Sequence, residues 1–253
     1  MMLMRLTQRI GRFAFMSLRG PNIKIFELDR MQIAVEPWSW KFAVDRRAEI
    51  DRHFAELTRN RPRVWNGRVM LLSRYSIRDR VLHGACFETD YASFSAWRDW
   101  QFPDPAVYNL FSAAALRAAD GAYLVGEMAP GTAAAGRLYF PAGTPEPEDV
   151  DAAGALDLAD NLQRELKEET GLDIGELDVE PGWCAITDRG FIPLLKRLTA
   201  RQSADELRSR IMRYLAGERE PEFVDIRILR RPDDLDARMP NFVVAFLEQI
   251  WRQ

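Results

Sequence analysis

The stretch RELKEETGL, residues 164–172, places three glutamates within five positions of one predicted helix. Glu165, Glu168 and Glu169 stand three or four positions apart or side by side, so their carboxylates share a face and repel one another. They also lie near the C-terminal end of the helix, where the negative end of the dipole disfavours acids. Local conflicts of this kind are expected at functional sites.

The helix that carries these glutamates is predicted over residues 157–170. Asp157 suits the N-cap, because its side chain can accept hydrogen bonds from the first free backbone N–H groups. Leu158, Leu162 and Leu166 recur every four positions and form an apolar stripe that faces a core. Gly171 ends the helix, since glycine adopts the left-handed conformation at little cost.

A divalent cation would remove the repulsion between the three carboxylates. Mg²⁺ or Mn²⁺ takes oxygen ligands and is held by a few carboxylates together with substrate phosphates. Carboxylates one helical turn apart can converge on such an ion. A solvated acidic face is the simpler interpretation of paired glutamates alone, so the residues around them must decide.

At these spacings the stretch resembles the second half of the Nudix box. That motif reads G, five residues, E, seven residues, then R-E-aliphatic-x-E-E-x-G-aliphatic. A chance match to the seven constrained positions of its second half anywhere in this chain is on the order of 10⁻⁵ at average amino-acid usage. Upstream, Asp120-Gly121 between apolar runs predicts a hairpin, and residues 136–145 predict a strand that ends in a Pro/Gly loop. Nudix domains have such elements before the box, so the resemblance covers roughly residues 110–250.

The resemblance implies roles for the residues of the motif. Glu165, Glu168 and Glu169 are expected to bind Mg²⁺ or Mn²⁺, and Glu168 and Glu169 are expected to take part in catalysis. Arg164 is expected to hold the loop of the box through an ion pair, in support of catalysis.

The two glycines of the box and the residues at the substrate follow from the same resemblance. Gly143 corresponds to the opening glycine and Gly171 to the closing one. Ala142, Gly143 and Glu222 are expected to contact the substrate.

The first half of the box departs from the pattern. Gly143 and Arg164 are 21 positions apart, whereas the motif has 14, which implies an insertion of seven. Leu156 occupies the position, counted back from Arg164, where the first glutamate belongs. We consider replacements for this structural partner at Glu146, Glu148 and Asp157, and expect residues 146–156 to form an exposed loop.

Nudix enzymes cleave a diphosphate linked to another group, which predicts a metal-dependent pyrophosphohydrolase. We expect water to attack one phosphorus in line, with a nucleoside monophosphate as product. Candidates for the general base are Glu169 and the acids of AGEREPEF, namely Glu218, Glu220 and Glu222. A Nudix-fold nucleotide sensor without activity is the competing prediction, although such proteins usually lose the carboxylates that this chain keeps.

The substrate is less defined than the reaction. WNG at 65–67 and TDY at 89–91 weakly resemble Nudix members that hydrolyse UDP-sugars; a coenzyme A diphosphate, a related dinucleotide or a nucleoside triphosphate stay open. A nucleobase stacks readily on aromatic side chains. Two groups of aromatic residues are candidates for stacking on the base: Tyr139, Phe140, Trp183 and Phe191 in the Nudix-like part, and Tyr91, Phe94, Trp97 and Trp100 upstream of it. For both groups, packing in a core is the favoured role.

Strands mixed with a few helices predict an α+β fold, a Nudix α/β/α sandwich with a mixed sheet and a smaller N-terminal α+β segment. We expect an N-terminal extension at residues 1–30, an N-terminal subdomain at 31–108 and the Nudix domain at 109–253. Further predictions are a helix at 45–59 capped by Asp45, and a hairpin turn at Asn66-Gly67.

Composition narrows the function classes. The chain has 253 residues, of which 47% are hydrophobic and 29% charged, with a net charge of −3; this balance points away from nucleic acid. Two cysteines indicate no disulfide framework and a cytoplasmic protein, and two histidines exclude a histidine-rich metal site. No apolar run is long enough for a membrane span. We expect a small-molecule diphosphate as partner and allow for a homodimer; the basic, acid-free residues 1–26 are interpreted as an extension, with a transit peptide as the alternative.

Overall fold

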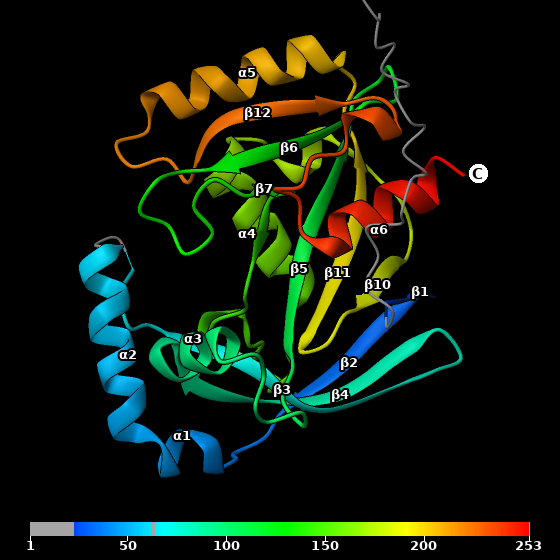
Figure 1. Cartoon of the computed structure of the whole chain (residues 1–253). Coiled ribbons are helices and arrows are strands. Elements are labelled where there is room, and N and C mark those ends of the chain that lie inside the picture. Colours follow the sequence, from blue (N-terminus) through cyan, green and yellow to red (C-terminus); the bar gives the residue numbers. More distant parts are fainter. Residues whose placement is uncertain (1–22, 62–63, 253) are drawn as a thin grey trace, which may run out of the picture.

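A mixed sheet forms the centre of the computed structural model, which describes residues 23–61 and 64–252 (Figure 1). Within those residues the sheet has nine strands, in the order β1-β10-β11-β5-β6-β12 with three short strands beside this path. Strands β5 and β11 pair in parallel, and the other pairings in this sheet are antiparallel. The strands are β1 (Lys24–Leu28), β5 (Asn109–Arg117), β6 (Tyr123–Met128), β7 (Leu138–Tyr139), β8 (Ala142–Gly143), β9 (Asp178–Val179), β10 (Trp183–Thr187), β11 (Phe191–Thr199) and β12 (Phe223–Leu229).

Helices cover both faces of this sheet. Alternate residues of a strand point to opposite faces, and in β5 Leu110 and Ala114 belong to one core cluster whereas Phe111 and Ala113 belong to another. The first cluster contains α4 (Leu158–Thr170) and α5 (Ala204–Gly217), and the second contains α6 (Asn241–Ile250). Figure 1 accordingly shows α6 in front of the sheet and α4 behind it.

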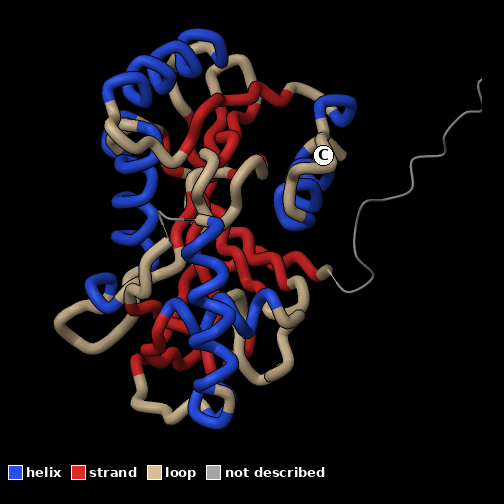
Figure 2. Tube along the Cα trace, turned by 60° about the vertical axis from the view of Figure 1, so that its left-hand side comes forward, coloured by secondary structure: helices blue, strands red, loops and turns tan. Residues whose placement is uncertain are grey.

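A smaller sheet lies at the N-terminal end of the chain. Its order is β2 (Arg30–Val35), β4 (Val81–Asp90) and β3 (Arg68–Arg78). The N-terminal lobe, defined here as residues 30–108, also contains α1 (Lys41–Asp45), α2 (Arg47–Asn60) and α3 (Tyr91–Asp99). Figure 2 shows these helices beside the strands of the lobe. The expected α+β class, with a mixed sheet between helices and a smaller α+β segment, is confirmed.

Backbone hydrogen bonds join the two sheets. Met70 N of β3 donates to Pro145 O at 2.8 Å, in the loop after β8 of the larger sheet; within the lobe, Leu72 N donates to Tyr108 O at 2.8 Å, next to the start of β5. Ile33 and Met70 lie in the same core cluster as the leucines of α4. The lobe is thereby held directly against the loop that precedes α4.

The expected N-terminal extension is only partly within the described residues. Residues 1–22 lie outside them, whereas β1 follows and pairs with β10 at an edge of the larger sheet. In the part of the chain that the structure describes, no helix has the length and apolar character needed to cross a membrane.

Several local predictions hold and others are wrong. The hairpin around Asp120-Gly121 forms between β5 and β6, and Gly121 has a φ of 86°. The hairpin at Asn66-Gly67 does not form: Asn66 Oδ1 instead accepts from Ala92 N at 2.8 Å, at the start of α3. The β3–β4 turn lies at Asp79 and Arg80, both with positive φ.

Two further expectations differ from the observed elements. Asp45 ends α1 instead of capping the next helix, and Arg46 occupies the N-cap of α2 without a side-chain hydrogen bond. The strand expected over 136–145 is reduced to β7 and β8, because these two segments pair with different neighbours, β6 and β5.

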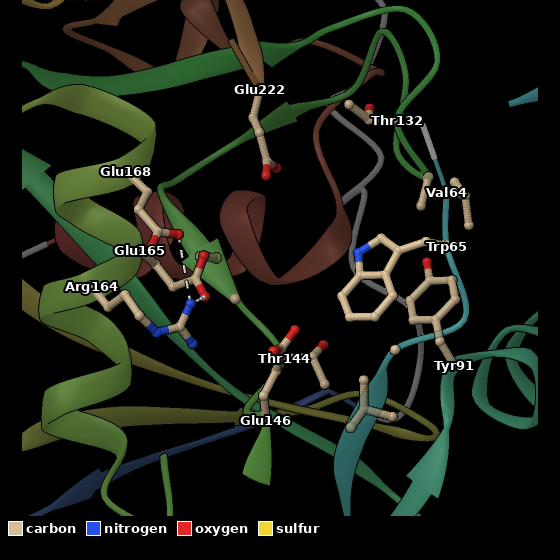
Figure 3. Close-up of a pocket in the computed structure, with 15 residues that line it drawn as sticks. Val64, Trp65, Tyr91, Thr132, Thr144, Glu146, Arg164, Glu165, Glu168 and Glu222 are labelled. Atoms are coloured by element: carbon tan, nitrogen blue, oxygen red, sulfur yellow. Dashed lines mark ion pairs between the residues drawn. The ribbon is translucent and has the colours of Figure 1, made fainter. Parts of the chain in front are cut away.

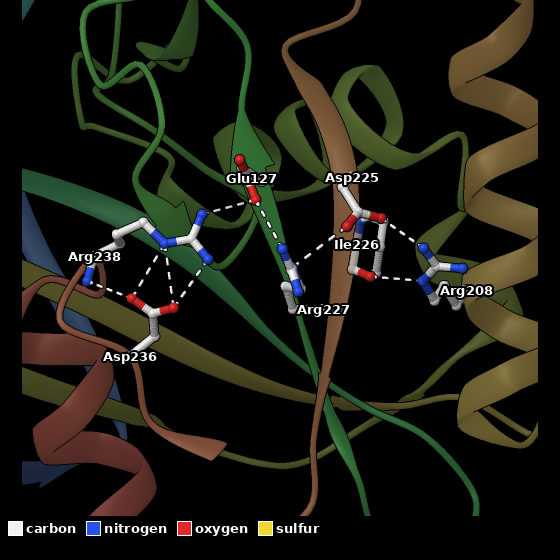
Figure 4. Close-up of polar contacts among 7 residues, drawn as sticks. All are labelled: Glu127, Arg208, Asp225, Ile226, Arg227, Asp236 and Arg238. Carbon is white, nitrogen blue, oxygen red and sulfur yellow. Dashed lines mark hydrogen bonds and ion pairs between the residues drawn. The ribbon is translucent and has the colours of Figure 1, made fainter.

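A network of charged side chains fixes β12 against its surroundings (Figure 4). Arg208 of α5 contacts Asp225 Oδ1 at 2.6 Å and Ile226 O at 2.7 Å. Glu127 of β6 accepts from Arg238 at 2.9 Å, in the segment that leads to α6. These bonds set the position of β12 and of Glu222, which directly precedes it.

Candidate active site

A cleft of about 340 Å³ lies between α4 and the N-terminal lobe (Figure 3). One wall is acidic and polar: Glu165, Glu168 and Arg164 come from α4, and Glu222 reaches in from the start of β12. The opposite wall consists of residues of the lobe, namely Val64, Trp65, Gly67, Val69 and Tyr91. The floor and rim are formed by residues 142–144, Glu146, Thr132 and Ala133.

Helix α4 forms as its sequence predicts. Asp157 caps it by accepting from Ala159 N and Asp160 N, and Gly171 follows it with a φ of 70°. Leu158, Leu162 and Leu166 are buried in the core. Burial of this stripe fixes the rotation of the helix and presents the neighbouring face, with Glu165 and Glu168, to the cleft.

Arg164 pairs with an acid that sequence reasoning missed. Its Nη2 contacts Asp149 Oδ2 at 3.1 Å and Oδ1 at 3.2 Å. Asp149 is 2% exposed and also accepts from Asn161 Nδ2 at 3.0 Å and Glu146 N at 2.8 Å. The expected replacements are therefore corrected: the ion pair goes to Asp149.

Glu146, Glu148 and Asp157, which we considered as partners of Arg164, have other positions in the structure. Glu146 occupies the N-cap of the short helix η1 (Pro147–Asp149), where its backbone O accepts from Asp149 N at 3.0 Å, and it lines the cleft. Glu148 is exposed, and Asp157 caps α4.

The signal for Asp149 was present in the sequence, counted from the other end of the motif. Asp149 follows Gly143 with five residues between them, which is the spacing of the first glutamate in the box. The insertion therefore lies after this acid and not before it. Counting back from Arg164 instead led to Leu156.

The insertion, residues 150–156, is a closed loop. Val150 and Leu156 form a β-bridge, and Asp157 N donates to Asp149 O at 2.8 Å across its base. Its returning segment pairs with the lobe, since Leu156 N donates to Ile33 O at 2.9 Å and Val35 N donates to Gly154 O at 3.0 Å. Because the base is closed, the insertion leaves Asp149 and the start of α4 adjacent.

Gly143 lies against Glu165 with no room for a side chain. A Cβ at position 143 would stand 2.1 Å from Glu165 Cδ. Real Cβ atoms do not approach so closely, so the glycine is needed for the loop to pass over the carboxylate. Gly143 also pairs with Ser112 of β5, which holds the loop in register with the sheet.

The electrostatic field at Glu165 favours a cation. Burial raises the pKa of the Glu165 carboxyl to about 8; Arg164, at 2.9 Å, acts in the opposite direction, and Glu168, Glu222 and Asp149 raise it further. Burial disfavours the charged form of Arg164, but Glu165 and Asp149 outweigh it and raise its pKa. One guanidinium therefore offsets only part of the surrounding negative charge.

Glu169 is buried behind the cleft. Its Oε2 accepts from Ala142 N at 2.9 Å, and the residue is 3% exposed. Burial raises the pKa of its carboxyl well above the ordinary value, and the charges of Glu222 and Glu165 raise it further. Glu169 is thus electrostatically coupled to the acids of the cleft and fixes the loop at Ala142.

The acids of AGEREPEF separate in the structure. Glu222 lines the cleft, whereas Glu218 and Glu220 do not. Figure 3 shows the Glu222 side chain pointing toward the space between the two walls.

The donor chemistry fits a hard divalent cation. The acids are carboxylates, the oxygen ligands that Mg²⁺ and Mn²⁺ prefer. Burial, and to a smaller extent the neighbouring acids, raises the pKa of Glu165 and Glu169. Within residues 23–61 and 64–252, however, no group of three or more His, Cys, Asp or Glu is gathered around a common point. Glu165 contacts Arg164, and Glu169 contacts Ala142.

Most aromatic residues considered for base binding pack in the core. Phe140, Trp183, Phe94 and Trp97 are buried, and Trp100 packs against the cluster under α2 and α3. Tyr139 and Phe191 line a different cavity, near the start of α6. Tyr91 lines the cleft beside Trp65, a residue that the sequence did not single out as a binding residue.

Two comparisons with known proteins find no match, and a third finds solved structures of low similarity. No family model matches the chain, and no curated protein matches it. A Nudix hydrolase from M. smegmatis, RenU, overlaps 57% of this chain and 86% of its own, at 15% identity and a TM-score of 0.38. A MutT protein from Methanosarcina mazei Go1 overlaps 57% of this chain and 94% of its own, at 16% identity and a TM-score of 0.38. Similarity at this level assigns neither a family nor an activity to this chain.

Proposed function

We propose that this protein is a Nudix-type hydrolase that cleaves the diphosphate bond of a nucleoside diphosphate linked to another group, with Mg²⁺ or Mn²⁺. The observation that carries the proposal is the acidic wall of the cleft. Glu165, Glu168 and Glu222 come from two elements and face one space, next to the loop at Ala142 and Gly143. A cleft with this charge would repel phosphate unless a cation accompanied it.

Glu165, Glu168 and Glu169 are the residues that we expect to hold the metal. When bound, a divalent ion neutralises phosphate charge, polarises a phosphoryl oxygen and lowers the pKa of a coordinated water. Arg164, held by the buried Asp149, positions Glu165 through an ion pair. Glu169 keeps the loop at Ala142 in place beside the substrate.

Glu222 is our assignment for the group that accepts the proton of the attacking water. It is the acid of its segment that reaches the cleft, and the network around β12 fixes its backbone. Glu222 takes the proton of the water as it attacks one phosphorus in line, the P–O bond between that phosphorus and the bridging oxygen breaks, and a nucleoside monophosphate and the phosphate of the other group are released.

The buried cysteines support a reducing compartment for this enzyme. Cys86 and Cys184 are free thiols inside the protein, and burial raises the pKa of each to about 12, so neither is reactive. A cytoplasmic location is therefore part of the proposal.

The test is a panel of diphosphates assayed with Mg²⁺ and with Mn²⁺: nucleotide sugars, coenzyme A, dinucleotides and nucleoside triphosphates. We expect cleavage of one class, its loss on chelation, and strong loss in Glu168→Gln and Glu222→Gln. Magnesium binding measured by calorimetry should persist in Glu222→Gln and weaken in Glu168→Gln. Asp160→Asn, on an exposed face of the same helix, is the control that should keep full activity.

A nucleotide sensor without activity is the second candidate. The observation that favours it is the engagement of Glu165 with Arg164 and of Glu169 with Ala142, with no three acids gathered at one point among the described residues. If no compound in the panel is cleaved while Glu168→Gln binds ligands as the parent does, the sensor function replaces hydrolysis.

A further inference from the structure

The wall of the cleft opposite the glutamates exposes a large aromatic ring. Trp65 is 69% exposed, more than any other large hydrophobic residue in the described ranges. Its indole nevertheless belongs to the lining of the cleft and faces the space in front of α4 (Figure 3). An exposed ring in a concave site leaves apolar surface to be buried by a ligand.

The indole is backed on one side by the chain itself. A Cβ at Gly67 would stand 2.7, 2.9 and 3.1 Å from Cη2, Cζ2 and Cζ3 of Trp65. These three neighbouring atoms are almost equally distant, so Gly67 lies under a face of the ring and not beside its edge. One face of the indole is therefore supported, and the other is available to the cleft.

The distribution of charge across the cleft limits what can occupy it. Carboxylates line the α4 side and the start of β12, whereas the Trp65 side presents Val64, Val69 and the ring of Tyr91. A ligand that is anionic at one end, with its cation, and flat and apolar at the other matches both walls. A volume of about 340 Å³ suits one small molecule of this kind.

We propose that Trp65 is the residue on which the nucleobase of the substrate stacks, with its diphosphate directed at the glutamates of α4. This inference rests on the proposed function and assigns the residue that recognises the base of its substrate. The N-terminal lobe then supplies substrate recognition, while the larger sheet supplies the reacting groups. Tyr91 flanks the base, and Gly67 keeps the indole in place.

Binding of the product tests this without any turnover. Calorimetry with Mg²⁺ compares the four nucleoside 5′-monophosphates with ribose 5-phosphate, which has the sugar and phosphate but no base. At least one nucleotide should bind the wild-type protein roughly 5- to 150-fold more tightly than ribose 5-phosphate, the range expected for stacking of a base on an aromatic ring. Trp65→Ala should remove most of this difference, and Trp65→Phe should keep most of it.

Gly67→Ala provides a second, independent variant. Its backbone is outside the left-handed region, so alanine adds no backbone strain, but the new methyl must displace the Trp65 ring. The variant should weaken nucleotide binding as Trp65→Ala does while leaving ribose 5-phosphate binding unchanged. Trp38→Ala is the control, since Trp38 is exposed outside the cleft and should leave both affinities unchanged.

Two results would overturn the inference: equal affinity of the wild-type protein for the nucleotides and ribose 5-phosphate, or undiminished nucleotide binding in Trp65→Ala. The hydrolysis assay separates this from the proposed function. Cleavage with a KM unaffected by Trp65→Ala refutes the stacking role alone. Nucleotide binding that depends on Trp65, without cleavage of any diphosphate, refutes hydrolysis alone.

Discussion

The residues of one wall of the cleft are close together in the sequence, whereas those of the other wall come from separate segments. The acidic wall comes from a continuous stretch of α4, in which cap, apolar stripe, glutamates and terminal glycine follow one another over fifteen residues. The aromatic wall comes from Trp65 and Tyr91, which flank β3 and β4 and reach the cleft because Met70 bonds to Pro145 across the two sheets. A motif within one helix can be recognised in the sequence, whereas a wall formed by residues from separate strands and sheets cannot.

This comparison predicts that the acidic wall governs turnover. Glu165→Gln or Glu168→Gln should lower kcat/KM by at least about 100-fold, because the metal that they hold contributes several kcal/mol to the transition state. Steady-state kinetics on the cleaved diphosphate, at saturating Mg²⁺, measures the loss. Equal activity of Glu168→Gln and Asp160→Asn would show that the carboxylate face has no catalytic part.

The ion pair between Arg164 and Asp149, behind the acidic wall, should contribute to the free energy of unfolding. Asp149→Ala leaves Arg164 without its buried partner and should lower the free energy of unfolding by about 2–4 kcal/mol; the 27% exposure of Arg164 keeps this below the loss for a fully buried pair. Urea denaturation gives the value. Glu148→Ala, the exposed neighbouring acid, is the matched control and should change stability little. Equal loss in both variants would contradict the assignment of Asp149.

The glycine at the base of the acidic wall should also be irreplaceable. Gly143→Ala places a methyl against Glu165, and overpacking of this kind costs about 1–3 kcal/mol. We expect lower stability together with lower kcat, since Glu165 must move. Gly217→Ala tests the opposite case, because no atom lies within 4 Å of a Cβ there; thermal denaturation should show no loss in that variant.

The acidic wall should make the chelated protein sensitive to pH. The pKa of Glu165 is raised from 4.5 to about 8, so between these values the folded state holds a proton that the unfolded state has released. Stability therefore falls as pH rises from about 4.5 to 8, by linkage. Urea denaturation in EDTA at several pH values should show this slope, and Glu165→Gln should reduce it. Stability that rises with pH over this range in both proteins would contradict the raised pKa of Glu165.

Prediction of the helix that carries the glutamates succeeded, because its signals are close in sequence. The stripe of leucines, the cap at Asp157 and Gly171 required only the geometry of one helix. Asp149 was missed although its spacing from Gly143 follows the box, because the insertion was placed before the acid instead of after it. The hairpin at Asn66-Gly67 was wrong because Asn66 bonds to the start of α3, a contact with a residue 26 positions away.

The sequence by itself determined α4, its cap at Asp157, its acidic face and the glycine that ends it, since each depends on hydrogen bonds and side chains within a few turns of one helix. Only the tertiary structure decided which acid holds Arg164, that Glu222 and not Glu218 or Glu220 enters the cleft, and that Trp65 stands opposite the glutamates. These placements depend on pairing between strands and on a core shared by the two sheets. Such contacts join residues far apart in the chain, and no local pattern encodes their geometry.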